Sequence, residues 1–274
     1  MDEREHSGCS AQQPSTIDPD SFPCLHFGIP PAGSSIPRGT GSTSWDYVDA
    51  TQHSVRGDKY LSDKKKYPSK PAVFQLVEVA GFSTKEPCRF YSELQESFYQ
   101  RARKAGRNVF IFIMHFDLRP MHTVMVFELD KDALANDKPF ATTFQRFLQG
   151  DDAYKNKRIK LLTSVVDANW MVKKAIGQPV PALIGNKLSC YYRQTADLCE
   201  CTCDVNSSMA AAAIVGVVKG ACKGIVCDLF LMIEGQAEDE LPERVSHHCS
   251  GKTQESLCQT LMLCLYVRLL SFVS

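Results

Sequence analysis

The amino-acid sequence predicts a single α+β domain, mainly antiparallel sheet with a few packed helices. Strand-like apolar runs occur in groups and do not alternate regularly with helices, which argues against a parallel βαβ arrangement. Several runs are joined by short connections, as is typical of antiparallel neighbours. The length of 274 residues, of which 44% are hydrophobic and 23% charged, suits a globular protein with a buried core.

The N-terminal half supplies three predicted strands and two predicted helices. Continuous β-forming residues between turn residues indicate strands, whereas apolar residues at helical spacing followed by a glycine indicate helices. These patterns place a strand at 72–79, a helix at 88–105, neighbouring antiparallel strands at 109–116 and 123–129, and a helix from Pro139 to Gly150.

The C-terminal half is richer in predicted strands. Residues 167–169 have a turn-forming composition, and Ser207 or Ser208 is suited to cap an Ala-rich helix. The predicted elements are strands at 158–166 and 170–176, a strand pair at 188–193 and 198–205, a helix at 209–219 and a last strand at 225–234.

Composition divides the chain into three parts. Residues 1–44, rich in Ser, Pro, Gly and Thr, predict a flexible leader, because they bury too little apolar surface to offset their ordering entropy. The folded domain is expected at 45–250. The apolar tail at 251–274 stays unassigned: with Arg268 inside it, it fits a docked helix better than a membrane span, and it lacks the polar face of an interfacial helix.

Charge and cysteine content restrict the partners and the compartment. The 31 Lys and Arg residues balance 31 Asp and Glu residues, which argues against nucleic acid as a main partner. The N-terminus has no apolar signal segment, so we expect a cytoplasmic protein in which the twelve cysteines are reduced and mostly buried. No glycine-rich phosphate loop is present, and we expect no cofactor.

Three cysteines alternate along one predicted strand and raise the question of a metal site. Cys199, Cys201 and Cys203 share one face of that strand, with His247, His248 and Cys249 further along the chain. Structural zinc sites favour ligands two to four residues apart, because the intervening turn wraps the ion, and this pattern lacks that turn. We therefore expect no metal here, and a strand that lines the core with small thiols.

Catalytic patterns are weak in this sequence. No cysteine stands in an elbow motif and no histidine stands beside an orienting carboxylate, so a Cys–His pair has no local support. The carboxylates of 238–243 flank Pro242, and we expect a solvated turn there. We therefore predict that the protein is not an enzyme; a cysteine nucleophile is the remaining catalytic alternative.

Two basic segments stand out in a chain of zero net charge. The candidate ligands for lipid-headgroup phosphates are Arg56, Lys59, Lys64, Lys65, Lys66, Lys157, Arg158 and Lys160. Each Lys or Arg near an anionic membrane surface contributes about 1 kcal/mol of binding. The alternatives are solvated loops, or pairing of these cations with the acids at 238–243.

Seven sequence blocks in a fixed order resemble the C-terminal domain of the plant ENHANCED DISEASE RESISTANCE 2 proteins. The blocks are Val55–Lys66, Phe147–Asp152 with Asn156–Leu161, Trp170–Lys173, Leu183–Gly185, Cys203–Ser208, Asp228–Glu234 and Glu240–Glu243. The resemblance runs from about Trp45 to Glu243. The cysteine-rich 199–203 replaces an acidic strand of the family, and the tail after Glu243 matches nothing in it.

The resemblance implies a membrane context but no chemistry. In the plant proteins the domain follows a phosphoinositide-binding pleckstrin-homology domain and a START-type lipid domain, and the whole protein negatively regulates defence at membranes. Residues 1–44 are too few to hold either upstream domain, and the family brings no catalytic residue set.

We therefore expect a non-enzymatic regulatory domain that binds anionic lipid or a membrane surface, and that is cytoplasmic or peripheral on membranes. In this interpretation the apolar strands near Phe110–Phe116 wall any cavity for acyl chains. The alternative is a protein–protein interaction module without a lipid ligand.

Overall fold

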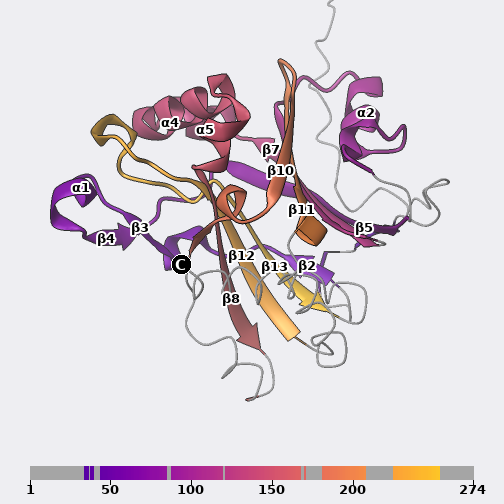
Figure 1. The fold of residues 1–274 in the computed structure, drawn as a ribbon, viewed down its shortest axis with the longest axis horizontal. Helices are drawn as coiled ribbons and strands as arrows, with labels where there is room; N and C mark the ends of the chain where they lie inside the picture. Colours follow the sequence, from indigo (N-terminus) through magenta and orange to yellow (C-terminus); the bar gives the residue numbers. More distant parts are fainter. Residues whose placement is uncertain are drawn as a thin grey trace, which may run out of the picture.

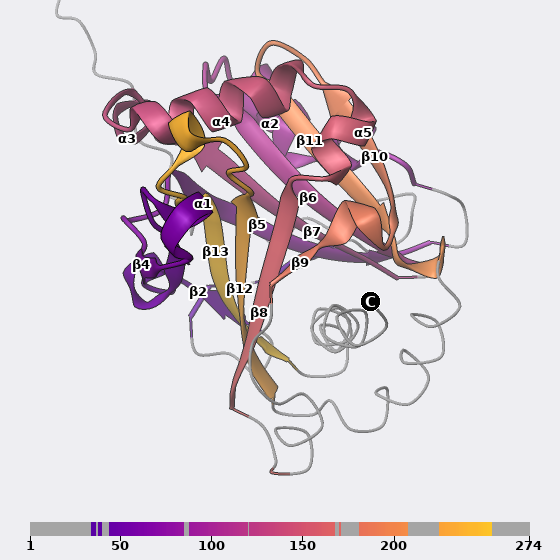
Figure 2. The same ribbon diagram turned by 60° about the vertical axis from the view of Figure 1, so that its left-hand side comes forward.

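The predicted α+β class is confirmed by a computed structural model. The structure describes residues 34–36, 38–39, 44–84, 88–119, 121–167, 170, 181–207 and 225–253. Two main sheets contain most of the strands, and helices α3 (Lys131–Ala135), α4 (Lys138–Gln149) and α5 (Asp152–Asn156) lie together at one end of them (Figures 1 and 2). Within the described residues, no helix has the length and apolar character needed to cross a bilayer.

The larger sheet has six strands in the order β1-β5-β7-β6-β11-β10. Its strands are β1 (Ser34–Ser35), β5 (Phe74–Ser83), β6 (Ile111–Leu118), β7 (Met121–Leu129), β10 (Ser189–Gln194) and β11 (Leu198–Asp204). The predicted antiparallel pairs β6–β7 and β10–β11 are both confirmed. The pairing of β11 with β6 is parallel and joins the two hairpins into one sheet.

The second sheet has five strands in the order β2-β13-β12-β8-β9. Its strands are β2 (Ser44–Asp46), β8 (Ile159–Asp167), β9 (Ala182–Leu183), β12 (Ile225–Ile233) and β13 (His247–Thr253). The predicted strands at 158–166 and 225–234 are confirmed as β8 and β12, which pair antiparallel. The latter is not the last strand, because β13 follows it and extends into the segment left unassigned at 251–274.

The prediction of a flexible leader at 1–44 needs correction near its C-terminal end. Residues 34–36 belong to the fold, not to a flexible leader, because Ser34 and Ser35 pair with β5 and the Ile36 side chain is buried. The rest of that leader up to residue 33, the predicted helix at 209–219 and the tail beyond 253 lie outside the described residues. So does the predicted strand at 170–176, apart from Trp170.

The predicted helix at 88–105 is present only in its second half. Helix α2 (Phe98–Lys104) is capped by Ser97, whose side chain accepts a hydrogen bond from the Gln100 N–H. The short 3-10 helix η3 (Tyr91–Glu93) lies before it. The buried Glu200 carboxylate of β11 accepts the backbone N–H groups of Tyr91 and Ser92 at 2.6 and 3.1 Å. A helix through this segment would break these bonds. Burial raises the pKa of Glu200 to about 7, against those hydrogen bonds, which lower it.

Helix α4 closes the end of the core as its sequence predicts. Asp137 caps it by accepting the Phe140 N–H, and Gly150 follows its last residue. Its buried face carries Phe140, Phe144 and Phe147. The Phe144 ring lies edge-on to Phe74 of β5, with 5.4 Å between ring centroids, so the helix is anchored to the larger sheet.

A histidine joins the two sheets at the centre of the core. The His247 ring, from β13, stacks on Phe74 with 4.2 Å between centroids and also contacts Phe112 and Phe127. It is fully buried, and neither ring nitrogen has a hydrogen-bond partner among the described residues. Burial therefore lowers the pKa of His247 well below its usual value, and the charge of His248 lowers it further.

We expect His247→Phe to flatten the loss of stability in acid. The folded state keeps this ring neutral while the unfolded chain binds a proton below about pH 6.5, so the free energy of unfolding falls by about 1.4 kcal/mol per pH unit as pH drops. The substitution removes that proton uptake. Urea unfolding between pH 7 and pH 5 measures the effect, with Phe144→Leu on α4 as a packing control that lowers stability equally at every pH. An unchanged pH slope for His247→Phe contradicts the prediction.

Candidate functional site

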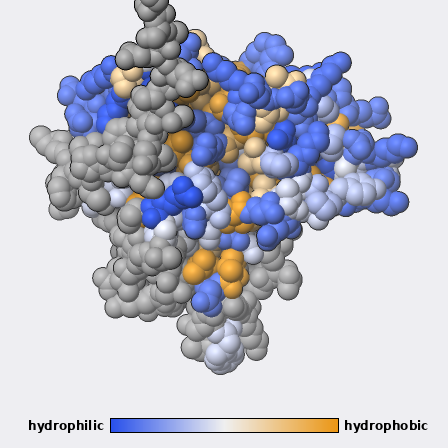
Figure 3. Space-filling view, turned by 180° about the vertical axis from the view of Figure 1, so that it is seen from behind, coloured by the Kyte–Doolittle hydropathy of each residue, from blue (hydrophilic) through white to orange (hydrophobic). Residues whose placement is uncertain are grey.

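A basic hairpin projects from one side of the molecule. Strands β3 (Ser54–Arg56) and β4 (Lys66–Pro68) pair antiparallel, and the four-residue helix α1 (Tyr60–Asp63) connects them (Figures 1 and 2). Lys64 ends α1 in a left-handed conformation, with φ of 57°. In the view from behind, the projecting side is mainly hydrophilic (Figure 3).

The hairpin exposes cations together with two larger apolar side chains. Lys59, Lys64, Lys65 and Lys66 are all exposed. Leu61 and Tyr67 are 39% and 52% exposed, and they belong to the same hairpin. The projecting surface is therefore amphipathic as well as basic.

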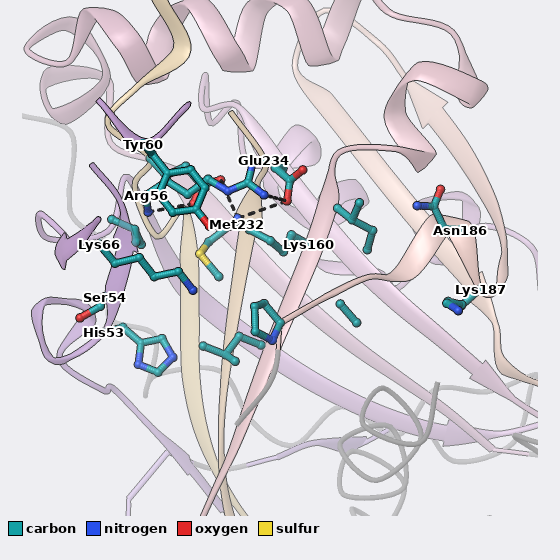
Figure 4. Close-up of a pocket in the computed structure, with 16 residues that line it drawn as sticks. His53, Ser54, Arg56, Tyr60, Lys66, Lys160, Asn186, Lys187, Met232 and Glu234 are labelled. Carbon is teal, nitrogen blue, oxygen red and sulfur yellow. Dashed lines mark hydrogen bonds and ion pairs between the residues drawn. The ribbon is translucent and has the colours of Figure 1, made fainter. Parts of the chain in front are cut away.

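A pocket of about 650 Å³ lies at the base of this hairpin. Its walls come from the hairpin, from β8 and β12, and from the segment 181–187, which includes the 3-10 helix η4 (Ile184–Asn186) (Figure 4). The lining residues are His53, Ser54, Val55, Arg56, Tyr60, Lys66, Lys160, Leu162, Pro181, Ala182, Leu183, Asn186, Lys187, Met232, Glu234 and Glu243. We call this the hairpin pocket.

Arg56 and Lys160 in the hairpin pocket are bound to carboxylates. Arg56 lies 2.9 Å from Glu234 and 3.6 Å from Glu243. Lys160 lies 2.5 Å from Glu243 and 3.6 Å from Glu234. The lining also contains Lys66 and Lys187, so it holds four cationic and two acidic side chains and has a formal excess of positive charge.

His53 adds no charge to this lining near neutral pH. Burial lowers its pKa, and the nearby Lys66 charge lowers it further. The imidazole stacks on Phe230 with 3.9 Å between centroids, which fixes its orientation. His53 is therefore a neutral, oriented ring in the lining of the pocket.

The structure brings together some of the predicted headgroup ligands and separates others. Arg56, Lys66 and Lys160 meet in the hairpin pocket, whereas Lys59, Lys64 and Lys65 lie on the exposed hairpin beside it. Lys157 is exposed on the turn after α5. Arg158 does not line the pocket: it is buried, and its guanidinium donates to Glu240 at 2.8 Å, so its placement gives no support to a headgroup contact.

The acidic segment 238–243 is a solvated turn only at Glu238 and Asp239, which corrects the sequence prediction. Glu240 and Glu243 are buried and accept hydrogen bonds from Arg158, just before β8, and from Lys160 of β8. Burial acts to raise the pKa of Glu240, but bonds from the Gln236 N–H, Arg158 and Arg146 outweigh it and hold the pKa below the usual value. The alternative in which these acids pair with the basic segments is present in the structure for Arg158 and Lys160.

The predicted acyl-chain wall gains no support from the hairpin pocket. Strand β6, which contains most of Phe110–Phe116, lies between β7 and β11 and is buried along its whole length. None of its residues lines the hairpin pocket. Their side chains are buried in the core of the described residues, so core packing is sufficient to explain their apolar run.

One wall of the pocket depends on a close backbone approach between η4 and α5, which the candidate residues from the sequence did not include. A Cβ atom on Gly185 would lie 2.4 Å from the Asn156 Cα atom, so only glycine allows η4 to pack on α5. Gly185 lies within the Leu183–Gly185 block noted above. The sequence therefore marked this segment through the family resemblance, but it gave no indication that the segment lines a pocket.

The fold and the site together define an α+β domain with a partly neutralised cationic pocket beside a basic hairpin. The family model described as Protein ENHANCED DISEASE RESISTANCE 2, C-terminal, matches residues 45–250, and this chain belongs to that family. The resemblance inferred from the sequence blocks is therefore confirmed.

One curated relative shows how much of each chain is covered by the similarity. The Arabidopsis thaliana protein named Protein ENHANCED DISEASE RESISTANCE 2-like is 28% identical over 202 residues, which cover 73% of this chain and 27% of the relative. The chain thus corresponds to a minor part of that protein's length. No solved structure matches the chain.

We expect Glu243→Gln to destabilise the fold by about 3–5 kcal/mol, because it leaves Lys160 and Arg56 partly uncompensated in a buried setting. Chemical denaturation at neutral pH measures the change. Glu238→Gln is the matched control, since Glu238 is exposed in the same segment. Equal stability of the two variants contradicts a structural role for the Glu243 ion pairs.

We expect Gly185→Ala to cost about 1–3 kcal/mol, because the added methyl group meets backbone and must displace η4 from α5. Gly251→Ala serves as the control, since a Cβ atom there meets nothing within 4 Å. Hydrogen exchange of residues 181–187, measured alongside denaturation, locates the change. Exchange that rises elsewhere but not in this segment argues against the predicted displacement.

Proposed function

We propose that this domain binds anionic lipid at a membrane surface as a non-enzymatic regulatory module. In this proposal the hairpin docks on the bilayer, and the hairpin pocket receives a phosphorylated headgroup. The observation that carries the proposal is the position of a pocket with excess positive charge at the base of a projecting, lysine-rich and amphipathic hairpin.

The hairpin has the composition of a peripheral membrane contact. Each lysine near an anionic surface contributes about 1 kcal/mol, so Lys59, Lys64, Lys65 and Lys66 together offer a few kcal/mol before any apolar contact. Leu61 and Tyr67 add apolar surface at the same place. An aromatic side chain with a polar end suits the bilayer interface, where one end is apolar and the other wet.

The pocket has a volume suited to a headgroup. Small-molecule sites fall within about 300–1,000 Å³ and place a few polar groups among apolar walls, and the hairpin pocket has both properties. Lys66 supplies attraction for a phosphate, while Arg56 and Lys160 hold the acidic side chains Glu234 and Glu243 in place. The proposed site therefore binds the polar end of the lipid, and this does not require an acyl-chain cavity beside the buried strand β6.

The absence of a recognisable catalytic arrangement in the sequence supports a binding role. A cytoplasmic location with reversible attachment to membranes follows from the same proposal. The runner-up is a protein–protein interaction module without a lipid ligand. It is favoured by Glu234 and Glu243 in the pocket lining, because these carboxylates repel phosphate and would suit a partner that carries both signs of charge.

We expect Lys64→Glu/Lys65→Glu/Lys66→Glu to abolish flotation with vesicles that contain phosphatidylserine or phosphoinositide. Loss of three cations removes at least about 3 kcal/mol, roughly 100-fold in affinity, and the new carboxylates add repulsion. The control carries the same charge change at Lys104, Lys131 and Lys138, which are exposed outside the hairpin.

Three outcomes separate the candidates. Binding to anionic vesicles that the hairpin variant loses and the control variant keeps supports the lipid proposal. Equal loss in both variants shows attraction by overall charge and overturns a specific hairpin role. Indifference of the unaltered protein to anionic lipid leaves the interaction module as the better hypothesis.

A further inference from the structure

A cluster of three thiols lies at the edge of the larger sheet, away from the hairpin pocket. Cys190 on β10 is the register partner of Cys203 on β11, and Cys201 lies two residues before Cys203 on the same face. The Cys190 and Cys203 Sγ atoms are 3.1 Å apart, and those of Cys201 and Cys203 are 3.8 Å apart. All three Sγ atoms lie within 4.8 Å of one another, and all three residues are buried. We call this the thiol cluster.

The sequence pattern pointed to a different trio. Cys199, Cys201 and Cys203 alternate along β11, but Cys199 is not part of the cluster. Its place is taken by Cys190, which is brought in by the β10–β11 register. Three alternate residues on one strand extend too far along it to bind a single ion. A cysteine on the neighbouring strand, directly opposite Cys203, lies closer to the other two.

The sulfur spacing fits a bound metal ion. With metal–sulfur bonds of about 2.3 Å, neighbouring sulfurs stand about 3.8 Å apart in a tetrahedron and about 4.0 Å apart in a trigonal plane. The distances within the thiol cluster span those values, so small side-chain rotations suffice. No fourth His, Cys, Asp or Glu joins the group among the described residues, which favours a three-sulfur site.

A buried lysine beside the cluster supplies matching charge. Lys155 is 6% exposed, and among the described residues no carboxylate pairs with it. Its ammonium group lies over the Tyr192 ring, 5.5 Å from the centroid, and Tyr192 is the register partner of Cys201. A negatively charged metal–thiolate centre on the strand that faces Tyr192 would attract this ammonium group.

We propose that Cys190, Cys201 and Cys203 bind a thiophilic d10 metal ion, with Cu(I) as the species that best fits a three-sulfur site. Soft thiolate ligands select Cu(I) and Zn(II), and Zn(II) in structural sites takes four ligands. Binding of Cu(I) with loss of two thiol protons leaves two thiolates and one thiol on the ion. The centre then carries one negative charge, which Lys155 balances, and no electron is transferred.

Entry of the ion uses the sheet edge. Strand β10 ends the strand order of the larger sheet, and Cys190 is 8% exposed. Edge elements open locally at lower free energy than central strands. The β10–β11 hairpin, seen in Figures 1 and 2, therefore supplies the three cysteines and also opens to admit the ion.

The test is an anaerobic Cu(I) titration of the full chain against a chromophoric Cu(I) chelator. We expect one ion per chain, three sulfur neighbours by X-ray absorption, and loss of binding in Cys190→Ala and Cys203→Ala. Cys199→Ala is the matched control, because Cys199 is buried on the same strand face outside the cluster. Lys155→Met leaves all thiols in place and should weaken binding about 10–100-fold.

Several results would overturn the proposal. These are no competition with the chelator, equal Cu(I) binding by Cys190→Ala and the unaltered chain, or unchanged affinity in Lys155→Met. Tighter binding of Zn(II) than Cu(I), with a fourth ligand in the X-ray absorption spectrum, rejects the three-sulfur assignment. Circular dichroism of each variant separates lost binding from lost folding.

Discussion

The hairpin and its pocket depend on a buried ion-pair network around Glu243. The Glu243 carboxylate accepts from Lys160, from the Arg56 N–H and from the Gly235 N–H, while the Glu243 N–H donates to the Arg56 carbonyl. One residue thus joins β3 of the hairpin to β8 and to the loop after β12. Buried charges are costly to desolvate, so such a network is poor evidence for stability by itself. Its directional bonds fix where the hairpin attaches.

This network divides the cations of the two basic segments into two groups. Arg56, Arg158 and Lys160 are held by Glu234, Glu240 and Glu243 and act as internal anchors. The exposed lysines of the hairpin and Lys157 remain in contact with solvent. The same residue type in the same sequence segment therefore serves different purposes, according to whether its side chain enters the fold or leaves it. Charge density in the sequence alone overstates the number of ligand contacts.

The parts of the fold that could be predicted are those encoded by neighbouring residues. The β6–β7 and β10–β11 pairs follow from apolar runs and short connections, and α4 follows from Pro139, Gly150 and its phenylalanines. The failures all involve partners distant in sequence. Glu200 holds residues 91 and 92 out of a helix, and Arg158 draws Glu240 into the interior. Cys190 joins its cluster only through strand register, which no spacing along a single strand reveals.

A zero net charge limits how the proposed membrane contact operates. Without a long-range field of one sign, the protein is not steered from a distance, and the attraction is local to the hairpin. The Debye length is about 8 Å at physiological ionic strength, so exposed lysines act only once the hairpin is close to the headgroups. Salt then weakens the hairpin contacts much more than the buried pairs of Glu243. The docking surface therefore responds to ionic conditions while its attachment to the domain does not.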